Sequence, residues 1–239
     1  GRTIAQNDIS ERVWIVTFSL LGHCTRTGAL GMVVSSSSVA VAARCAHVRA
    51  DVGVVGSQNV TDPRLGPKGL DLLARGLTAE ETLARVIGDA PHPAWRQVAV
   101  LSRDGDGAVA HGAKTLGLHA GQVGAHCVAA GNMLANTDVP SAMVERFEAT
   151  EDDDLGDRLI AALIAGEAAG GEAGQVHSAG LVMAHRVAWP DADLRVDWSE
   201  TPIAELTALW MRWKPEMDAY VSRALDPDAA PSYGVPGDP

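Results

Sequence analysis

The sequence predicts an α+β domain in which two stacked antiparallel sheets lie between layers of helices, a four-layer αββα sandwich. Two observations lead to this fold class. Apolar runs with the length of strands come in blocks, and helical patterns come in separate blocks between them. A regular alternation of single strands and helices would instead indicate a parallel sheet. Two sheets stacked between two helical layers would bury each of these apolar runs.

The first strands are expected near the beginning of the chain. Residues 13–21 form a run rich in β-branched, aliphatic and aromatic side chains, bounded by Gly22. A turn signal follows at residues 26–28, and the strand pattern resumes over residues 30–34. The two runs should pair as a hairpin. A third buried strand is expected over residues 52–58.

Two helices should come next. Pro67 is suited to the first turn of a helix that extends to about residue 75. Thr78 and Glu81 have the spacing of a capping box, in which each side chain hydrogen-bonds the backbone N–H of the other. This pattern predicts a second helix that begins after Thr78 and ends near residue 87.

The second half of the chain repeats this order of strands and helices. The dipeptide Asp104-Gly105 marks a hairpin turn. The remaining expected elements are strands over 97–102, 107–111, 123–130, 179–185 and 193–196, and helices over 140–149, 155–169 and 201–213. We divide the chain into a leader (1–16), one domain (17–225) and a flexible C-terminal tail (226–239).

Composition and charge exclude several classes of partner. The 239 residues carry a formal net charge of −11, which disfavours nucleic acids and anionic membranes. No apolar run approaches the roughly 20 residues that span a bilayer. The cysteines are Cys24, Cys45 and Cys127, an odd and widely spaced set that fits reduced thiols better than a disulfide framework. We therefore expect a cytoplasmic protein without a membrane or nucleic-acid partner.

Several blocks of sequence then occur in a fixed order. They include VTFSL, LGMVVSSSS, GPKGLDLLARGLTAEE, AAGNMLAN and ALIAGEAAGG. Together they resemble a bacterial family of domains of unknown function, number 1028, over about residues 15–210. That family resembles the N-terminal-nucleophile hydrolases and implies an αββα sandwich. Typical members begin almost directly at Thr-Phe-Ser, whereas 16 residues precede Thr17 here.

The resemblance implies a catalytic threonine. The hydroxyl of Thr17 would attack an amide carbonyl, with the α-amine of the same residue as general base. A terminal amine with a pKa near 8 can accept a proton at neutral pH. This role requires removal of residues 1–16, because the nitrogen of Thr17 is otherwise an amide. Threonine is also an ordinary strand residue, so its position alone carries little weight.

Other residues are candidates for the same site. Asn132, which follows Gly131, is a candidate oxyanion donor, with a turn residue as the alternative. Glu167 is a candidate catalytic acid if it is buried, and otherwise belongs to a solvated helix end. Ser35, Ser36 and Asn59 are candidate substrate-binding residues, with ordinary polar positions at strand ends and in loops as the alternative.

The sequence thus predicts a hydrolase of a small amide or cyclic amide that needs no cofactor and forms a homo-oligomer. Two other functions stay open. One is a metal-assisted hydrolase or deaminase that uses histidine and cysteine ligands, although none of the adjacent pairs has the spacing of a known zinc motif. These pairs are His23-Cys24, Cys45-Ala46-His47 and His126-Cys127. The other is a small-ligand-binding oligomer without enzymatic activity.

Overall fold

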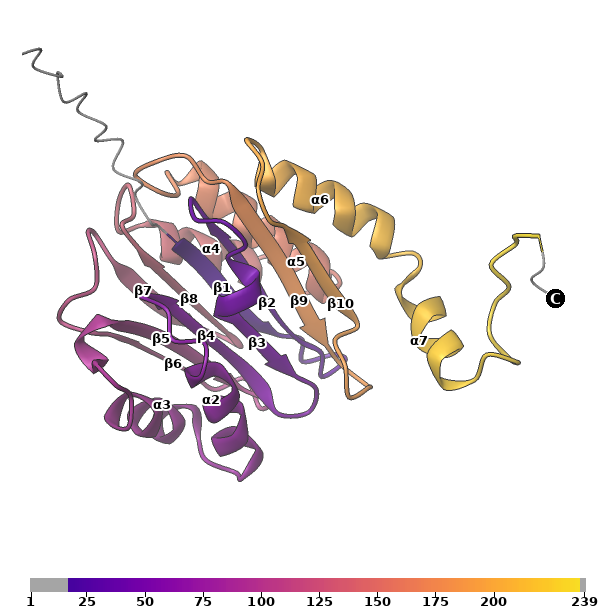
Figure 1. Cartoon of the computed structure of the whole chain (residues 1–239), viewed down its shortest axis with the longest axis horizontal. Helices are drawn as coiled ribbons and strands as arrows, with labels where there is room; N and C mark the ends of the chain where they lie inside the picture. The colour runs from indigo at the N-terminus through magenta and orange to yellow at the C-terminus, as the bar shows by residue number, and fades with distance from the viewer. Residues whose placement is uncertain (1–16, 237–239) are drawn as a thin grey trace, which may run out of the picture.

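The computed structural model describes residues 17–236 and has two antiparallel sheets that face each other (Figure 1). The larger sheet has six strands in the order β10-β9-β2-β1-β8-β7, and the smaller has four in the order β3-β4-β5-β6. The six strands are β1 (Thr17–His23), β2 (Leu30–Ser36), β7 (Ala120–Gly124), β8 (Cys127–Asn132), β9 (Ser178–Ala184) and β10 (Ala192–Val196). The four are β3 (Ala46–Arg49), β4 (Gly53–Asn59), β5 (Arg96–Ser102) and β6 (Gly107–His111).

Helices cover the outer face of each sheet, which confirms the predicted four-layer αββα sandwich. On the smaller sheet these are α2 (Leu65–Ala74) and α3 (Ala79–Gly88), and on the larger sheet α4 (Val139–Glu148), α5 (Leu155–Ala168) and α6 (Pro202–Trp213). A short α1 (Ala42–Cys45) and a 3-10 turn (Pro93–Trp95) lie between strands. The last helix, α7 (Met217–Leu225), extends away from the sandwich in Figure 1.

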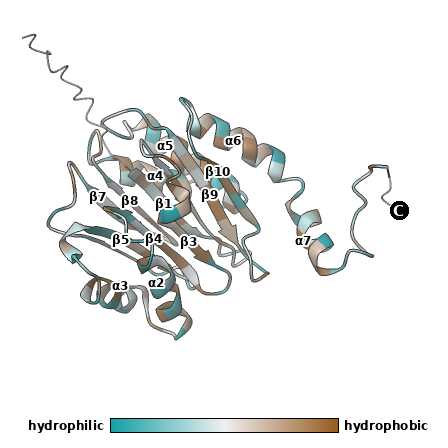
Figure 2. Cartoon of the chain, viewed as in Figure 1, coloured by the Kyte–Doolittle hydropathy of each residue, from teal (hydrophilic) through white to brown (hydrophobic). Residues whose placement is uncertain are grey.

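The alternation of side chains along β1 assigns its two faces. Phe18 and Leu20 pack against the helices of the larger sheet, and Leu21 belongs to the apolar cluster between the two sheets. Because successive residues of a strand point to opposite faces, Thr17 and Ser19 share the inner face with Leu21. Figure 2 shows helices with both hydrophobic and hydrophilic residues, as expected where only one side of a helix packs on a sheet.

The capping box predicted for α3 is confirmed. The backbone N–H of Glu81 donates to Thr78 Oγ1 over 3.2 Å, and the backbone N–H of Thr78 donates to Glu81 Oε2 over 2.9 Å. The helix begins at Ala79, one residue after its cap. The preceding helix begins at Leu65, two residues before Pro67.

One predicted strand is wrong. Residues 123–130 are not a single strand, because the chain turns at Ala125 and His126 and pairs β7 with β8. His126 adopts a left-handed backbone conformation with φ of 60°, which allows the tight turn. Strand β3 and helix α7 were also not predicted. The N-terminal part of the first expected strand, 13–16, lies outside the described residues, as does the expected leader.

No helix among residues 17–236 combines the length and the apolar character that crossing a bilayer requires.

Candidate active site

Thr17 is the first residue of β1, which is a central strand of the larger sheet. In the register of that sheet it pairs with Ser36 of β2 on one side and with Asn132 of β8 on the other. Directly opposite residues of antiparallel strands point to the same face. The three polar side chains therefore form one row at the end of the inner face. The Thr17 side chain is buried, with 4% of the residue exposed.

Hydroxyl groups surround the Thr17 side chain on the β2 side. Thr17 Oγ1 donates to Ser36 Oγ over 3.3 Å, and Ser36 Oγ lies 2.7 Å from Ser38 Oγ. The guanidinium of Arg44 in turn donates to Ser38 Oγ. A cation thus sits at the far end of a short hydroxyl chain that begins at Thr17.

A second polar row faces the first across the sandwich. In the smaller sheet, Gln97 of β5 pairs with Gln58 of β4 and with His111 of β6. Asn132 Nδ2 donates to Gln97 Oε1 over 2.9 Å, which joins the two rows. A second connection runs from Ser19 Oγ to Gln58 Oε1 over 2.9 Å. Ser19, Gln58, Gln97 and Asn132 are all buried.

The hydrogen bonds of Gln97 set the direction of this network. Its Nε2 donates to the carbonyl oxygen of Gly131 and to His111 Nδ1, and its Oε1 accepts from both Gln58 and Asn132. His111 Nδ1 must then be an acceptor, so neutral His111 carries its proton on Nε2. Burial, with a smaller effect of His119, lowers the pKa of His111, which favours this neutral form.

Asn132 keeps one acceptor without a protein partner. Its Oδ1 is buried and accepts no hydrogen bond from the residues that the structure describes. Buried polar atoms without a partner are few in native proteins and tend to mark functional positions. Oδ1 can only accept, so it suits a donor group of a substrate, whereas an oxyanion would need the second N–H of Nδ2, since the first is donated to Gln97.

The candidate acid Glu167 lies exposed on the last turn of α5, so the buried carboxyl that the catalytic role required is not found at this position. The solvated helix end, the alternative left open by the sequence, is the position that it occupies. The buried carboxyl of this region is Glu172, which is 7% exposed. Ser37 N–H donates to Glu172 Oε1 over 3.0 Å, while Oε2 has no partner among the described residues. Burial raises the pKa of Glu172 to about 9.

Glu172 was missed because it lies in a loop, where no periodic pattern predicts burial. The backbone around it pairs with the segment that follows β8: Leu134 and Glu172 form an isolated antiparallel bridge. This bridge brings the loop after α5 to the same end of the sheet as Asn132.

Two predicted substrate-binding residues point elsewhere. Ser35 pairs with Phe18 and so faces the helices, where its hydroxyl donates to the carbonyl oxygen of Ser178 over 3.0 Å. Asn59 connects two loops: its Nδ2 donates to the carbonyl oxygen of Trp95 over 2.7 Å, and its Oδ1 accepts from the N–H of Leu116 over 3.1 Å. Among the candidates, the structure brings together Thr17, Ser36 and Asn132.

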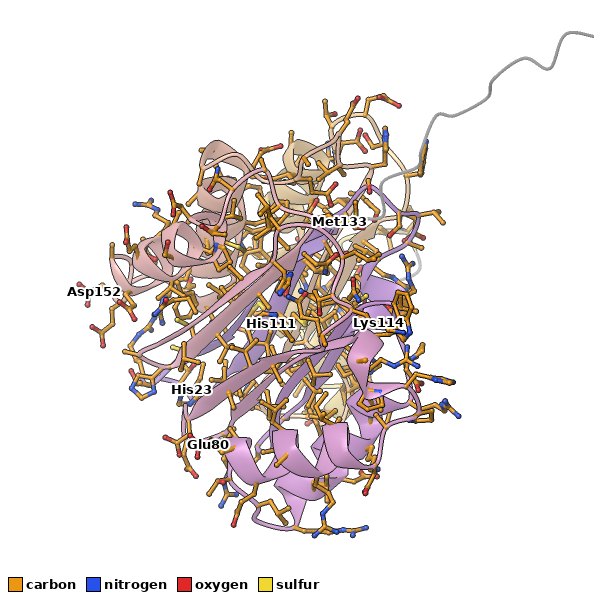
Figure 3. The ribbon with its side chains drawn as sticks, turned by 90° about the vertical axis from the view of Figure 1, so that its left-hand side faces the viewer. His23, Glu80, His111, Lys114, Met133 and Asp152 are labelled. Carbon is orange, nitrogen blue, oxygen red and sulfur yellow. The ribbon has the colours of Figure 1, made fainter. Side chains whose placement is uncertain are left out.

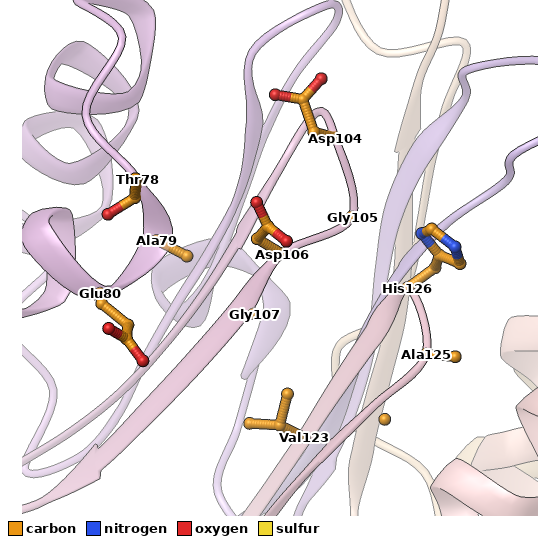
Figure 4. A pocket seen from close by; sticks show the side chains of 11 residues that line it. Thr78, Ala79, Glu80, Asp104, Gly105, Asp106, Gly107, Val123, Ala125 and His126 are labelled. Carbon is orange, nitrogen blue, oxygen red and sulfur yellow. The ribbon is translucent and has the colours of Figure 1, made fainter.

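Two hollows lie at opposite ends of the sheet. A cavity of about 270 Å³ is lined by Phe18, Glu167 and Glu172. A pocket of about 540 Å³, shown in Figure 4, is lined by Glu80, Asp104, Asp106 and His126. His126 accepts a backbone hydrogen bond from His23, the last residue of β1, so this pocket lies far along the strand from Thr17.

Figure 3 shows the same separation. Met133, which follows Asn132, is at the upper end of the sheet, and His23 and Glu80 are near the lower end.

The described residues provide no set of ligands for the metal ion of the alternative hypothesis. The described residues contain no group of three or more histidine, cysteine or acidic side chains arranged to hold a metal ion. Cys24, Cys45 and Cys127 are buried free thiols. Burial raises the pKa of Cys127 to about 12, so this thiol stays protonated at neutral pH.

The fold and the site together define a class of protein: an α+β sandwich with a threonine hydroxyl at the start of a central strand, between a serine and an asparagine. Residues 17–206 match the model of a family described as "Family of unknown function (DUF1028)", and the chain belongs to this family. This match confirms the resemblance to that family noted in the sequence.

Solved structures are similar to this chain over most of its length. The crystal structure of a DUF1028 protein from Silicibacter pomeroyi is 31% identical, with a TM-score of 0.77 over 82% of this chain and 85% of that chain. Anbu (ancestral beta-subunit) from Yersinia bercovieri is 10% identical, with a TM-score of 0.36 over 85% of this chain and 97% of that chain. A likeness of that size does not define the fold of this chain. No curated protein matches it.

Proposed function

We propose that this protein is a hydrolase of small amides or cyclic amides, with Thr17 as its nucleophile. The observation that supports the proposal most directly is the register of β1. It places the Thr17 hydroxyl at a strand end between the hydroxyl of Ser36 and the side-chain amide of Asn132. A nucleophile next to an amide donor is the arrangement that acyl transfer requires.

In the proposed reaction, Thr17 Oγ1 attacks the carbonyl carbon of the substrate amide, and the α-amine of Thr17 takes the hydroxyl proton. Asn132 stabilises the oxyanion of the tetrahedral intermediate. When the C–N bond breaks, the leaving amine receives the proton from the α-ammonium group. Water then hydrolyses the ester on Thr17 and releases a carboxylic acid. A cyclic amide would give one product that carries both the amine and the acid.

The α-amine can act as a base only after hydrolysis of the peptide bond between Val16 and Thr17. We propose that this bond is cut in the active protein. Water adds across the bond, which leaves a carboxylate on Val16 and a free amine on Thr17. Intact-mass measurement and N-terminal sequencing of the purified protein test this step directly, because the active form should begin at Thr17.

The activity is tested with a panel of small amides and lactams. Thr17→Ala should abolish turnover, whereas Thr17→Ser keeps a hydroxyl and should retain part of it. Thr207→Ala is the matched control, because its hydroxyl donates to the carbonyl oxygen of Ile203 on α6 and takes no part in the site. Undiminished turnover in Thr17→Ala would refute the proposal.

Asn132 has a separate test. Loss of one oxyanion donor costs about 100- to 1,000-fold in kcat in other acyl-transfer enzymes. We expect Asn132→Ala to reduce kcat by roughly this factor with a smaller change in KM. An unchanged kcat would assign Asn132 to the buried network alone. The predictions of a small-molecule partner and of a homo-oligomer stay predictions.

A further inference from the structure

In the cavity of about 270 Å³ that Phe18 lines, all ionisable lining residues among residues 17–236 are acidic. Glu167, Glu172 and Glu200 line it, and the lining contributed by residues 17–236 contains no lysine, arginine or histidine. Glu167 and Glu200 are exposed, so their charges are screened by solvent. Glu172 is the buried carboxyl of the set.

Glu172 provides an independent indication of a ligand. Its Oε1 accepts from the N–H of Ser37, and the Ser37 side chain also hydrogen-bonds the carboxyl group, but Oε2 is buried and has no hydrogen-bond partner among the described residues. A buried carboxyl oxygen normally has a hydrogen-bond partner, which is a protein group or an ordered water molecule. A cavity wall is a position where a bound molecule can supply that donor.

The charge of the walls selects the chemistry of that molecule. An anion would be repelled by the carboxylates of Glu167 and Glu200, and a neutral ligand would leave these two charges uncompensated. An ammonium group carries three N–H donors and a positive charge, so it can satisfy Glu172 Oε2 and interact favourably with Glu167 and Glu200.

The cavity is also connected to the candidate nucleophile through the chain. Phe18, which lines the cavity, directly follows Thr17. Ser37, which binds Glu172, directly follows Ser36, and Ser36 accepts the hydrogen bond from Thr17. A group held at Glu172 would thus lie close to the end of β1.

We propose that this cavity is a binding site for the ammonium group of a small molecule, held by Glu172. Assigning that molecule as the substrate or product amine rests on the proposed function, and the binding site itself does not. The substrate would then be a small amide that carries, or releases, an alkylammonium group.

Binding has a proton balance that can be measured. Burial raises the pKa of Glu172 to about 9, so before an ammonium ion binds this carboxyl group holds a proton at neutral pH. An ammonium ion that pairs with Glu172 favours the carboxylate, so the carboxyl proton passes to the buffer. We expect the release of about one proton for each bound ammonium ion at pH 7.5.

The test is isothermal titration of the full chain at pH 7.5 with n-butylammonium, n-butanol and butyrate, in phosphate and in HEPES, neither of which contains a primary ammonium group. The proposal expects saturable binding of n-butylammonium alone, with an enthalpy that differs between the buffers by their heats of protonation. Glu172→Gln keeps the acceptor for Ser37 and should remove the proton release and weaken binding about tenfold or more. Glu145→Gln, which changes an exposed carboxyl of α4 outside this cavity, is the control and should change affinity by less than about threefold.

Three results would overturn the inference: no saturable binding of n-butylammonium at millimolar concentration, equal binding of butanol or butyrate, or proton release that persists in Glu172→Gln. The same titration of Thr17→Ala separates the two proposals. Ammonium binding in both proteins without hydrolysis of any amide would refute the proposed function and leave the cation site. Amide hydrolysis without ammonium binding would refute the cation site and leave the proposed function.

Discussion

Asn132 donates a hydrogen bond from Nδ2 to Oε1 of Gln97, and both side chains are fully buried between the two sheets. Gln97 uses its Nε2 for the carbonyl oxygen of Gly131 and for His111. Rotation of the Gln97 amide by half a turn would therefore set oxygen against oxygen on one side and donor against donor on the other. The orientation of Asn132 is fixed by a residue of the opposite sheet.

Replacement of Gln97 by leucine should destabilise the protein. The variant would leave Gln58 Nε2 and Asn132 Nδ2 without their shared acceptor in a buried environment. Each unpaired buried group costs about 1–3 kcal/mol, so we expect a loss of roughly 3 kcal/mol in the free energy of unfolding. Urea denaturation measures this loss. Gln122→Leu, at an exposed position of β7, is the control and should change stability by less than about 0.5 kcal/mol. Equal effects of the two substitutions would contradict the network.

Glu172 should make stability depend on pH in a defined direction. Its pKa is about 9 in the folded protein, raised by burial from 4.5. Between these values the folded state keeps the proton and the unfolded state releases it, so rising pH favours unfolding. Relative to the wild type, Glu172→Gln should therefore gain stability as the pH rises from 5 to 9, by at most about 1.4 kcal/mol per pH unit. Denaturant unfolding at pH 5, 7 and 9 measures the difference. Glu167→Gln is the control and should not show this trend. A stability difference between Glu172→Gln and the wild type that stays constant with pH would show that Glu172 is ionised in the folded protein.

Much of the fold followed from local patterns in the sequence. The capping box at Thr78 and Glu81 and the hairpin around Asp104 and Gly105 depend on residues within four positions of each other, and both were predicted. The β7–β8 hairpin was not, because its turn uses His126 at positive φ rather than the asparagine or glycine that marks such turns.

The site was only partly predictable for a related reason. The resemblance pointed to Thr17 and Asn132, but their direct pairing depends on the register of β1 and β8, which lie more than 100 residues apart in sequence. Gln58 and Gln97 look like ordinary polar strand residues until the two sheets are stacked. Glu172 forms an isolated β-bridge with Leu134, and no local sequence pattern predicts this long-range pairing.

The capping box offers a local test of helix α3. Thr78→Ala removes the acceptor for the N–H of Glu81 and should lower the free energy of unfolding by about 1 kcal/mol. Thr207→Ala is a matched substitution inside α6, where the hydroxyl donates to the carbonyl oxygen of Ile203 and no cap is lost. Alanine favours helix interiors, so this control should be neutral or slightly stabilising. Thermal and urea denaturation of both variants measure the change in stability. An unchanged free energy of unfolding in Thr78→Ala would contradict the role of the cap.

The last prediction concerns the contact between α5 and α6. Gly156, in the first turn of α5, faces the buried ring of Trp210, and a Cβ atom there would come within 2.2 Å of Trp210 Cζ2. The ring cannot move freely, because its Nε1 donates to Asp157 Oδ1 over 2.8 Å. Gly156→Ala should therefore lower the free energy of unfolding by about 1–3 kcal/mol through overpacking, despite the better helix propensity of alanine. Gly88, the last residue of α3, is the control: a Cβ atom added there would meet no other atom within 4 Å. Gly88→Ala should be neutral or stabilising by up to about 1 kcal/mol. Urea denaturation should show a loss of stability for Gly156→Ala and none for Gly88→Ala, and a stabilising Gly156→Ala would show that the two helices separate easily at this contact.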